Sequence, residues 1–108
     1  MSANEPKAEY GFHSTVNALL PETIERVTAA LREEGFGVLT TIDVAQTLRD
    51  KLQVTFQPYT ILGACNPQLA YRALQADRNI GMLLPCNVVV YEENGCSTVS
   101  ILDPERML

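Results

Sequence analysis

Residues 61–75, "ILGACNPQLAYRALQ", decide the fold because they hold the end of a strand, a turn and the start of a helix. The β-rich run up to Cys65 is typical of a buried strand. Asn66 can then cap a helix, and Pro67 can occupy its first turn. Apolar residues recur at helical spacing beyond this point: Leu69, Ala70, Ala73 and Leu74. The stretch therefore predicts a strand that turns directly into an amphipathic helix with its apolar side facing inward.

The same alternation of strand and helix patterns extends over the rest of the chain. Strands are predicted over residues 10–16, 36–42, 54–65, 87–92 and 96–102, and helices over 21–35, over 43–52 and from 66 onward. The "ENG" sequence at 93–95 predicts a hairpin turn between the last two strands. The order β-α-β-α-β-α-β-β favours an α+β fold. We expect a two-layer sandwich in which a mixed or antiparallel sheet of about five strands carries helices on one face.

The length of the chain sets its domain organisation. At 108 residues it has room for one core. Residues 1–9 are expected to form a flexible lead-in, and residues 10–108 a single α+β domain. The closing residues 103–108, "DPERML", resemble the start of a further helix, because an N-cap residue is followed by a proline.

Composition excludes several classes of function. The formal charge is −5, and the eight Lys and Arg residues are scattered, which argues against nucleic acid and anionic lipid as partners. No apolar run reaches the roughly 18 residues of a membrane helix. Three cysteines without C-x-x-C spacing do not form a secreted disulfide framework, and the N-terminus lacks a hydrophobic signal core. We therefore expect a cytoplasmic protein with reduced thiols.

Two cysteines are the strongest candidates for chemistry. Cys65 precedes the cap Asn66, where the helix dipole can lower a thiol pKa from about 8.5 into the range of about 3.5–7.5. Cys86 lies in "LLPCNVVV" and is likewise followed by an asparagine, Asn87. Such thiols could act in redox chemistry or bind a soft metal, and a disulfide is possible if their Cα atoms lie within about 7 Å. The simpler interpretation is two unrelated cysteines that pack as small apolar side chains.

Other polar residues give weaker signals. Tyr59 lies on the strand and Arg72 on the helix that meet at residue 66. A hydroxyl and a guanidinium near this helix start would suit a small anion. The favoured interpretation is a helix surface that simply packs. His13 could join Cys65 and Cys86 in a three-ligand zinc or haem-iron site. Because no spacing supports that set, we expect no metal and no cofactor, and an ordinary strand histidine.

Familiar catalytic patterns are missing from the sequence. The glycines form no G-x-G-x-x-G or P-loop run, and no nucleophile lies in a recognised local signature. The carboxylates fall on faces predicted to be solvated: Glu22, Glu25, Glu33, Glu34, Glu92 and Glu93. They favour solubility over paired acid–base catalysis.

Several segments closely resemble the family known as domain of unknown function 302, over nearly the whole chain from about Tyr10. They are "EEGFGVLTTIDVAQTLRDKL", "PYTILGACNPQLAYRALQAD", "IGMLLPCNVVVYE" and "DPERM". The matching motif positions are Gly63, Cys65, Asn66, Pro67, Leu84, Pro85, Cys86 and Asn87. The resemblance implies a small α+β fold seen as homodimers in bacterial and archaeal proteins, and no established reaction, substrate or cofactor. It also implies a further C-terminal helix, which this chain, ending at Leu108, is expected to lack.

Two hypotheses of different classes follow. In the first, the chain is a homodimeric, non-catalytic module that binds a small ligand or a protein between its sheet and its helices. In the second, it is a thiol-dependent redox or metal-binding protein that uses Cys65 and Cys86. The first is favoured because the sequence holds no catalytic constellation and has an apolar connector, "IGMLLP", at 80–85.

Overall fold

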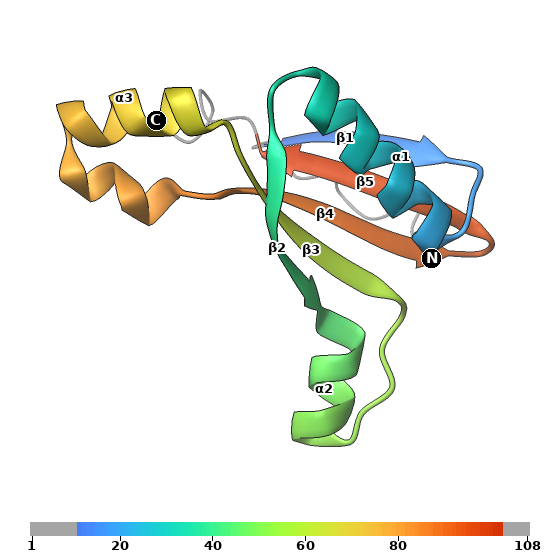
Figure 1. The fold of residues 1–108 in the computed structure, drawn as a ribbon. Helices are drawn as coiled ribbons and strands as arrows, with labels where there is room; N and C mark the ends of the chain where they lie inside the picture. Colours follow the sequence, from blue (N-terminus) through green and yellow to red (C-terminus); the bar gives the residue numbers. More distant parts are fainter. Residues whose placement is uncertain (1–10, 103–108) are drawn as a thin grey trace.

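A five-stranded antiparallel sheet forms the centre of the computed structural model, which describes residues 11–102 (Figure 1). Its strands are β1 (Gly11–Val16), β2 (Gly37–Asp43), β3 (Tyr59–Cys65), β4 (Cys86–Glu93) and β5 (Cys96–Leu102), and their spatial order is β1-β5-β4-β3-β2. The helices are α1 (Leu20–Glu33), α2 (Val44–Leu52), α3 (Pro67–Ala76) and the 3₁₀ helix η2 (Arg78–Leu83). The predicted α+β class and element order are confirmed. The predicted lead-in at 1–9 and the helix start at 103–108 lie outside the described residues.

Local signals fix the starts of α2 and α3. The side chain of Asn66 caps α3 by accepting a hydrogen bond from the Leu69 N–H at 3.2 Å, and Pro67 is the first helical residue. Asp43 caps α2 in the same way, accepting from the Gln46 N–H at 2.9 Å. Both helices therefore begin where a strand ends, with one capping residue between extended and helical backbone.

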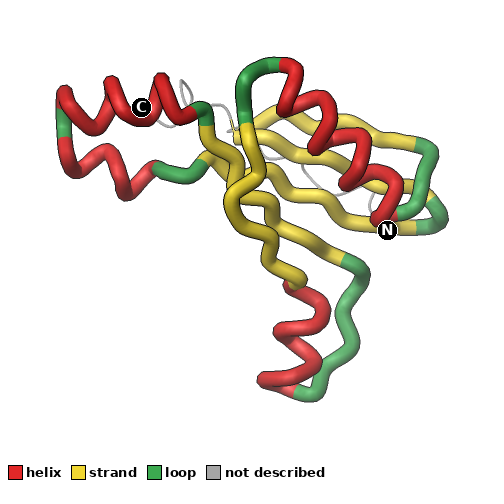
Figure 2. Tube along the Cα trace, viewed as in Figure 1, coloured by secondary structure: helices red, strands yellow, loops and turns green. Residues whose placement is uncertain are grey.

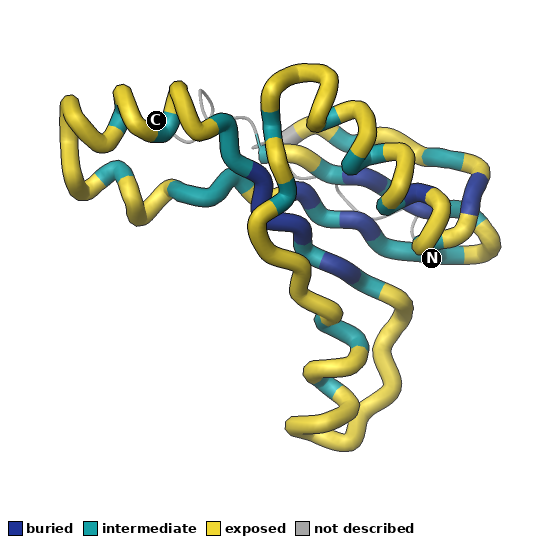
Figure 3. The backbone as a smooth tube through the Cα atoms, in the orientation of Figure 1, coloured by how far each residue is buried: buried dark blue, intermediate teal, exposed yellow. Residues whose placement is uncertain are grey.

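The core lies between the sheet and α1. Leu62, Val88 and Val90 are almost completely buried on the face that α1 covers, together with Ala64 and Val99. The predicted apolar stripe of α1 packs against them through Leu20, Ile24, Val27 and Leu31. Figure 3 shows the buried segments in dark blue along the strands beneath this helix. One amphipathic helix on one face of the sheet thus makes the folded core.

The other helices extend away from the sheet. α2 continues from the end of β2 and contacts mainly β3, whereas the contacts of α3 are mainly with η2. Figure 2 shows them as two separate helical projections. We call residues 44–56 the α2 arm and residues 67–83 the α3–η2 arm. Two of the residues predicted to face inward on α3, Leu69 and Leu74, are instead 49% and 36% exposed.

Within residues 11–102, none of the helices has both the length and the apolar character needed to cross a bilayer.

Candidate functional site

The two cysteines singled out from the sequence lie on neighbouring strands at the base of the α3–η2 arm. In the pairing of β3 with β4, Ala64 is opposite Cys86 and Gly63 is opposite Asn87. Directly opposed residues share a face of the sheet, and successive residues of a strand alternate between faces. Cys86 therefore lies on the face that α1 covers, with the buried Ala64. Cys65 and Asn87 lie on the opposite face, which we call the open face.

This alternation bears directly on disulfide formation. Cys65, Cys86 and Cys96 are all partly buried free thiols. Although Cys65 and Cys86 are close along adjacent strands, their side chains leave the sheet in opposite directions. A bridge between them would need backbone movement, because the Cβ vectors point apart. The two cysteines are therefore neighbours on adjacent strands, but their thiols lie on opposite faces of the sheet.

On the open face, side chains from β2 and from the segment before β4 pack closely against Gly63. A Cβ added there would lie 2.3 Å from Thr40 Oγ1 and 2.8 Å from Pro85 Cγ. No side chain fits at these distances, so β2, β3 and the segment leading into β4 can approach only because residue 63 is a glycine. Two of the family motif positions, Gly63 and Pro85, therefore serve packing at this junction.

Asn66 also lies against the turn that follows α1. Besides capping α3, its side-chain nitrogen would lie 3.1 Å from a Cβ added at Gly35. Gly35 ends the turn after α1 with a φ of +86°, a conformation that glycine adopts without strain. Asn66 thus links the start of α3 to the turn between α1 and β2.

Tyr59 and Arg72 do not come together. Tyr59 begins β3 and Cys65 ends it, which separates them by about 20 Å at the normal rise per residue of a strand. The ring of Tyr59 stacks on Tyr91, with centroids 5.5 Å apart and planes 6° apart, and tilts against Phe56 at 5.8 Å. Arg72 is exposed on α3. The two side chains suggested for a small anion therefore belong to different ends of the molecule.

His13 is likewise distant from the cysteines. It is paired with Ser100 of β5, and its Nδ1 lies 2.7 Å from Ser100 Oγ. Two further strands, β5 and β4, separate β1 from β3, which places about 14 Å between His13 and the line of β3. Among residues 11–102, no group of three His, Cys, Asp or Glu side chains is arranged to hold a metal ion.

Sequence reasoning missed the role of Glu92, which it assigned to a solvated face. The Leu20 N–H donates to Glu92 Oε1 at 2.8 Å, so a carboxylate from β4 caps α1. The residue at the N-cap position itself, Leu19, has no side chain that can accept this bond. The sequence signal for this role is a helix start that has no capping residue of its own. The free N–H groups of such a helix need an acceptor from elsewhere in the fold.

A larger feature that the sequence did not reveal is an exposed apolar surface. Thirteen large apolar side chains of residues 11–102 are exposed, and ten of them lie on β2 and the two arms. We call these ten the arm surface: Leu39, Ile42, Leu52, Val54, Phe56, Leu69, Tyr71, Leu74, Met82 and Leu83. In Figure 3 both arms are drawn mostly in the colour of exposed residues. Exposed apolar side chains concentrated on a few elements in this way are typical of an interaction surface.

Comparison with known proteins agrees with the fold. The family model described as "Domain of unknown function DUF302" matches residues 12–108. No curated protein matches the chain. A solved structure, the crystal structure of an uncharacterized conserved protein DUF302 from Bacillus stearothermophilus, is 39% identical with a TM-score of 0.84. The alignment covers 93% of this chain and 78% of that one. Since the family model spans nearly the whole chain, the chain belongs to the DUF302 family.

Proposed function

We propose that the chain is a homodimeric, non-catalytic module that binds a small ligand or a protein partner. The observation that carries this proposal is the amount of apolar surface outside the core. Thirteen large apolar side chains are exposed within residues 11–102, whereas six apolar residues form the buried core. Single exposed apolar residues are ordinary, but ten of these thirteen lie on β2 and the two arms, and a concentration of this kind is typical of a chain that buries part of its surface against another molecule.

Three residues with polar or special backbone character have structural roles, which supports a non-catalytic module. Asn66 caps a helix and packs on a turn, Gly63 is required for close strand packing, and Glu92 caps α1. Each of these polar or special residues therefore has a task in holding the fold.

Native mass spectrometry of the freshly purified protein, with and without reductant, tests the proposal. We expect the mass of two chains, unchanged by reductant, and a shift in melting temperature with at least one compound from a metabolite screen. A single-chain mass at micromolar concentration in gentle conditions, confirmed by analytical ultracentrifugation, would contradict the dimer. A dimer whose melting temperature no compound changes would leave only the protein-binding version.

The second candidate is a thiol-dependent redox or metal-binding protein. The observation that favours it is the position of Cys65, one residue before the cap of the ten-residue helix α3. Additional mass matching a metal, or a loss of two hydrogens that reductant reverses, would favour this candidate.

Since the cytoplasm keeps thiols reduced, we also propose a cytoplasmic location for a protein with three free cysteines, which cell fractionation tests.

A further inference from the structure

The two arms leave the molecule at opposite ends of one free sheet edge. β2 is the outermost strand, and every residue from Leu39 to Asp43 is exposed. α2 continues directly from the end of β2. α3 begins beside the start of β2, because Gly37 pairs with Cys65, the residue before the α3 cap. Figure 1 shows β2 between the two helical projections.

We infer that a second copy of this chain docks on this edge. In the inferred dimer, β2 runs antiparallel to the β2 of the other copy about a two-fold axis. The α2 arm of each copy then lies against the α3–η2 arm of the other. This inference rests on the proposed dimer and names the surface that forms it.

The edge strand has the character of a pairing surface. Between Gly37 and Ile42 it carries no charge and no proline, two of the devices that protect a free edge, and its one charged residue, Asp43, comes at its end. Leu39 is 65% exposed and Ile42 is 48% exposed. The register irregularity between Val38 and Thr40 limits regular pairing to the short stretch that follows. Most of the contact area must therefore come from the arms.

The two-fold axis determines which arms meet. Antiparallel pairing places the end of one strand beside the start of its partner. Because α2 leaves the end of β2 and α3 begins beside its start, the α2 arm of one copy lies next to the α3–η2 arm of the other. The same contact occurs twice, as an isologous interface requires.

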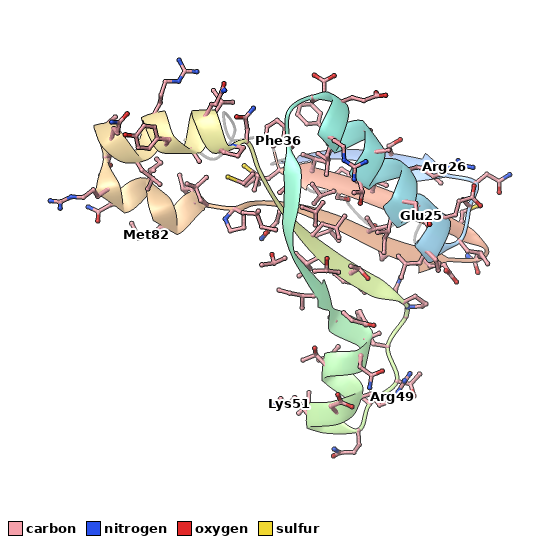
Figure 4. All side chains as sticks on the ribbon, viewed as in Figure 1. Glu25, Arg26, Phe36, Arg49, Lys51 and Met82 are labelled. Carbon is pink, nitrogen blue, oxygen red and sulfur yellow. The ribbon has the colours of Figure 1, made fainter. Side chains whose placement is uncertain are left out.

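Apolar side chains are exposed on both arms. Leu52 on the α2 arm is 62% exposed. On the α3–η2 arm, Met82 is 85% and Leu83 is 50% exposed. Figure 4 shows Met82 on the α3–η2 arm, and Arg49 and Lys51 on the α2 arm. Each arm can thus bury apolar surface that its own sheet does not cover.

A second copy fits this surface better than an added peptide strand. A peptide that extends the sheet pairs with the edge and leaves both arms uncovered. A second copy covers the edge and both arms with its own edge and its own arms. The ten exposed apolar side chains of the arm surface are then all available to the contact between copies.

A matched pair of variants tests the location of the interface. Leu39→Asp places a charge on the edge, and Leu19→Asp places one at the start of α1, where the side chain is 54% exposed. By analytical ultracentrifugation we expect Leu19→Asp to dimerise like the unmodified protein, and Leu39→Asp to raise the dissociation constant at least 100-fold. A monomeric unmodified protein would refute the proposed dimer itself. An unmodified dimer that Leu39→Asp leaves intact would refute only the inferred surface.

Photo-crosslinking tests the contact between arms without destabilising the edge. Benzoylphenylalanine replaces Met82 in an isotopically labelled chain, which is mixed with unlabelled chain before irradiation and peptide mapping. We expect crosslinks between copies to fall within residues 44–56. The same label in place of Phe12, which is 59% exposed on β1, is the control and should give no crosslink between copies. Crosslinks from position 82 to any other element of the second copy would overturn the inference.

Discussion

Replacing Gly63 by alanine is expected to destabilise the protein strongly, because the new methyl group has no space. It would meet Thr40 Oγ1 at 2.3 Å and Pro85 Cγ at 2.8 Å. Thr40 is β-branched and restricted at χ1 in a strand, and the ring of Pro85 is rigid, so neither neighbour yields at low cost. The strands themselves must shift to accommodate the change.

The size of the effect follows from the cost of overpacking. Extra methylene groups in a packed core cost about 1–3 kcal/mol. Two contacts below 3.0 Å place Gly63→Ala at the upper end, about 2–3 kcal/mol in the free energy of unfolding. At about 4–8 °C per kcal/mol for a small domain, the melting temperature should fall by about 10–20 °C.

Chemical denaturation at fixed protein concentration measures this change, and two further variants make the result decisive. Gly37→Ala is the matched control: it is also a strand glycine, and its added Cβ has nothing within 4 Å, so its stability should change by less than about 0.5 kcal/mol. Thr40→Ala should recover at least about 1 kcal/mol in the Gly63→Ala background, measured as a double-mutant cycle. Equal stability of Gly63→Ala and the unmodified protein, or additive effects of the two substitutions, would refute the reasoning.

Three further changes test other parts of the structure. Asn66→Ala removes the cap of α3 and should cost about 1 kcal/mol in urea denaturation, whereas Asn66→Asp keeps the acceptor and most of the stability. Glu92→Ala leaves the first amide of α1 without its acceptor and should cost about 1–2 kcal/mol, while Glu92→Gln, which keeps an oxygen acceptor, should cost less; equal losses would contradict the capping role. After mild oxidation, peptide mapping should find no disulfide between Cys65 and Cys86 within one chain, because they lie on opposite faces of the sheet.

Local signals carried most of what the sequence predicted correctly. The Asn66–Pro67 pair marks the start of α3 through a cap and a fixed φ, both of which act within a few residues. The apolar spacing of α1 gave its buried face, and alternating or β-branched runs gave the strands. Because these signals depend on near neighbours along the chain, they could be recognised without knowledge of the tertiary fold.

The candidate site was less predictable because it depends on contacts between distant segments. That Cys65 and Cys86 lie on opposite faces follows from the pairing register of β3 with β4, which no local pattern specifies. The separation of Tyr59 from Arg72 follows from the length and direction of β3. The cap that Glu92 provides joins residues 72 positions apart.

The helices α2 and α3 illustrate why an amphipathic pattern is incomplete information. Both have an apolar side, as α1 has, yet only the apolar side of α1 packs against the buried core of its own chain. Periodicity says that a helix has a surface to bury, but it does not say in which molecule the covering surface lies. The apolar side chains that these helices leave exposed, Leu52, Leu69 and Leu74, would be a cost to a monomer. In the dimer proposed above, the same side chains belong to the contact between copies, so the apolar pattern of the sequence would serve the interface as well as the fold.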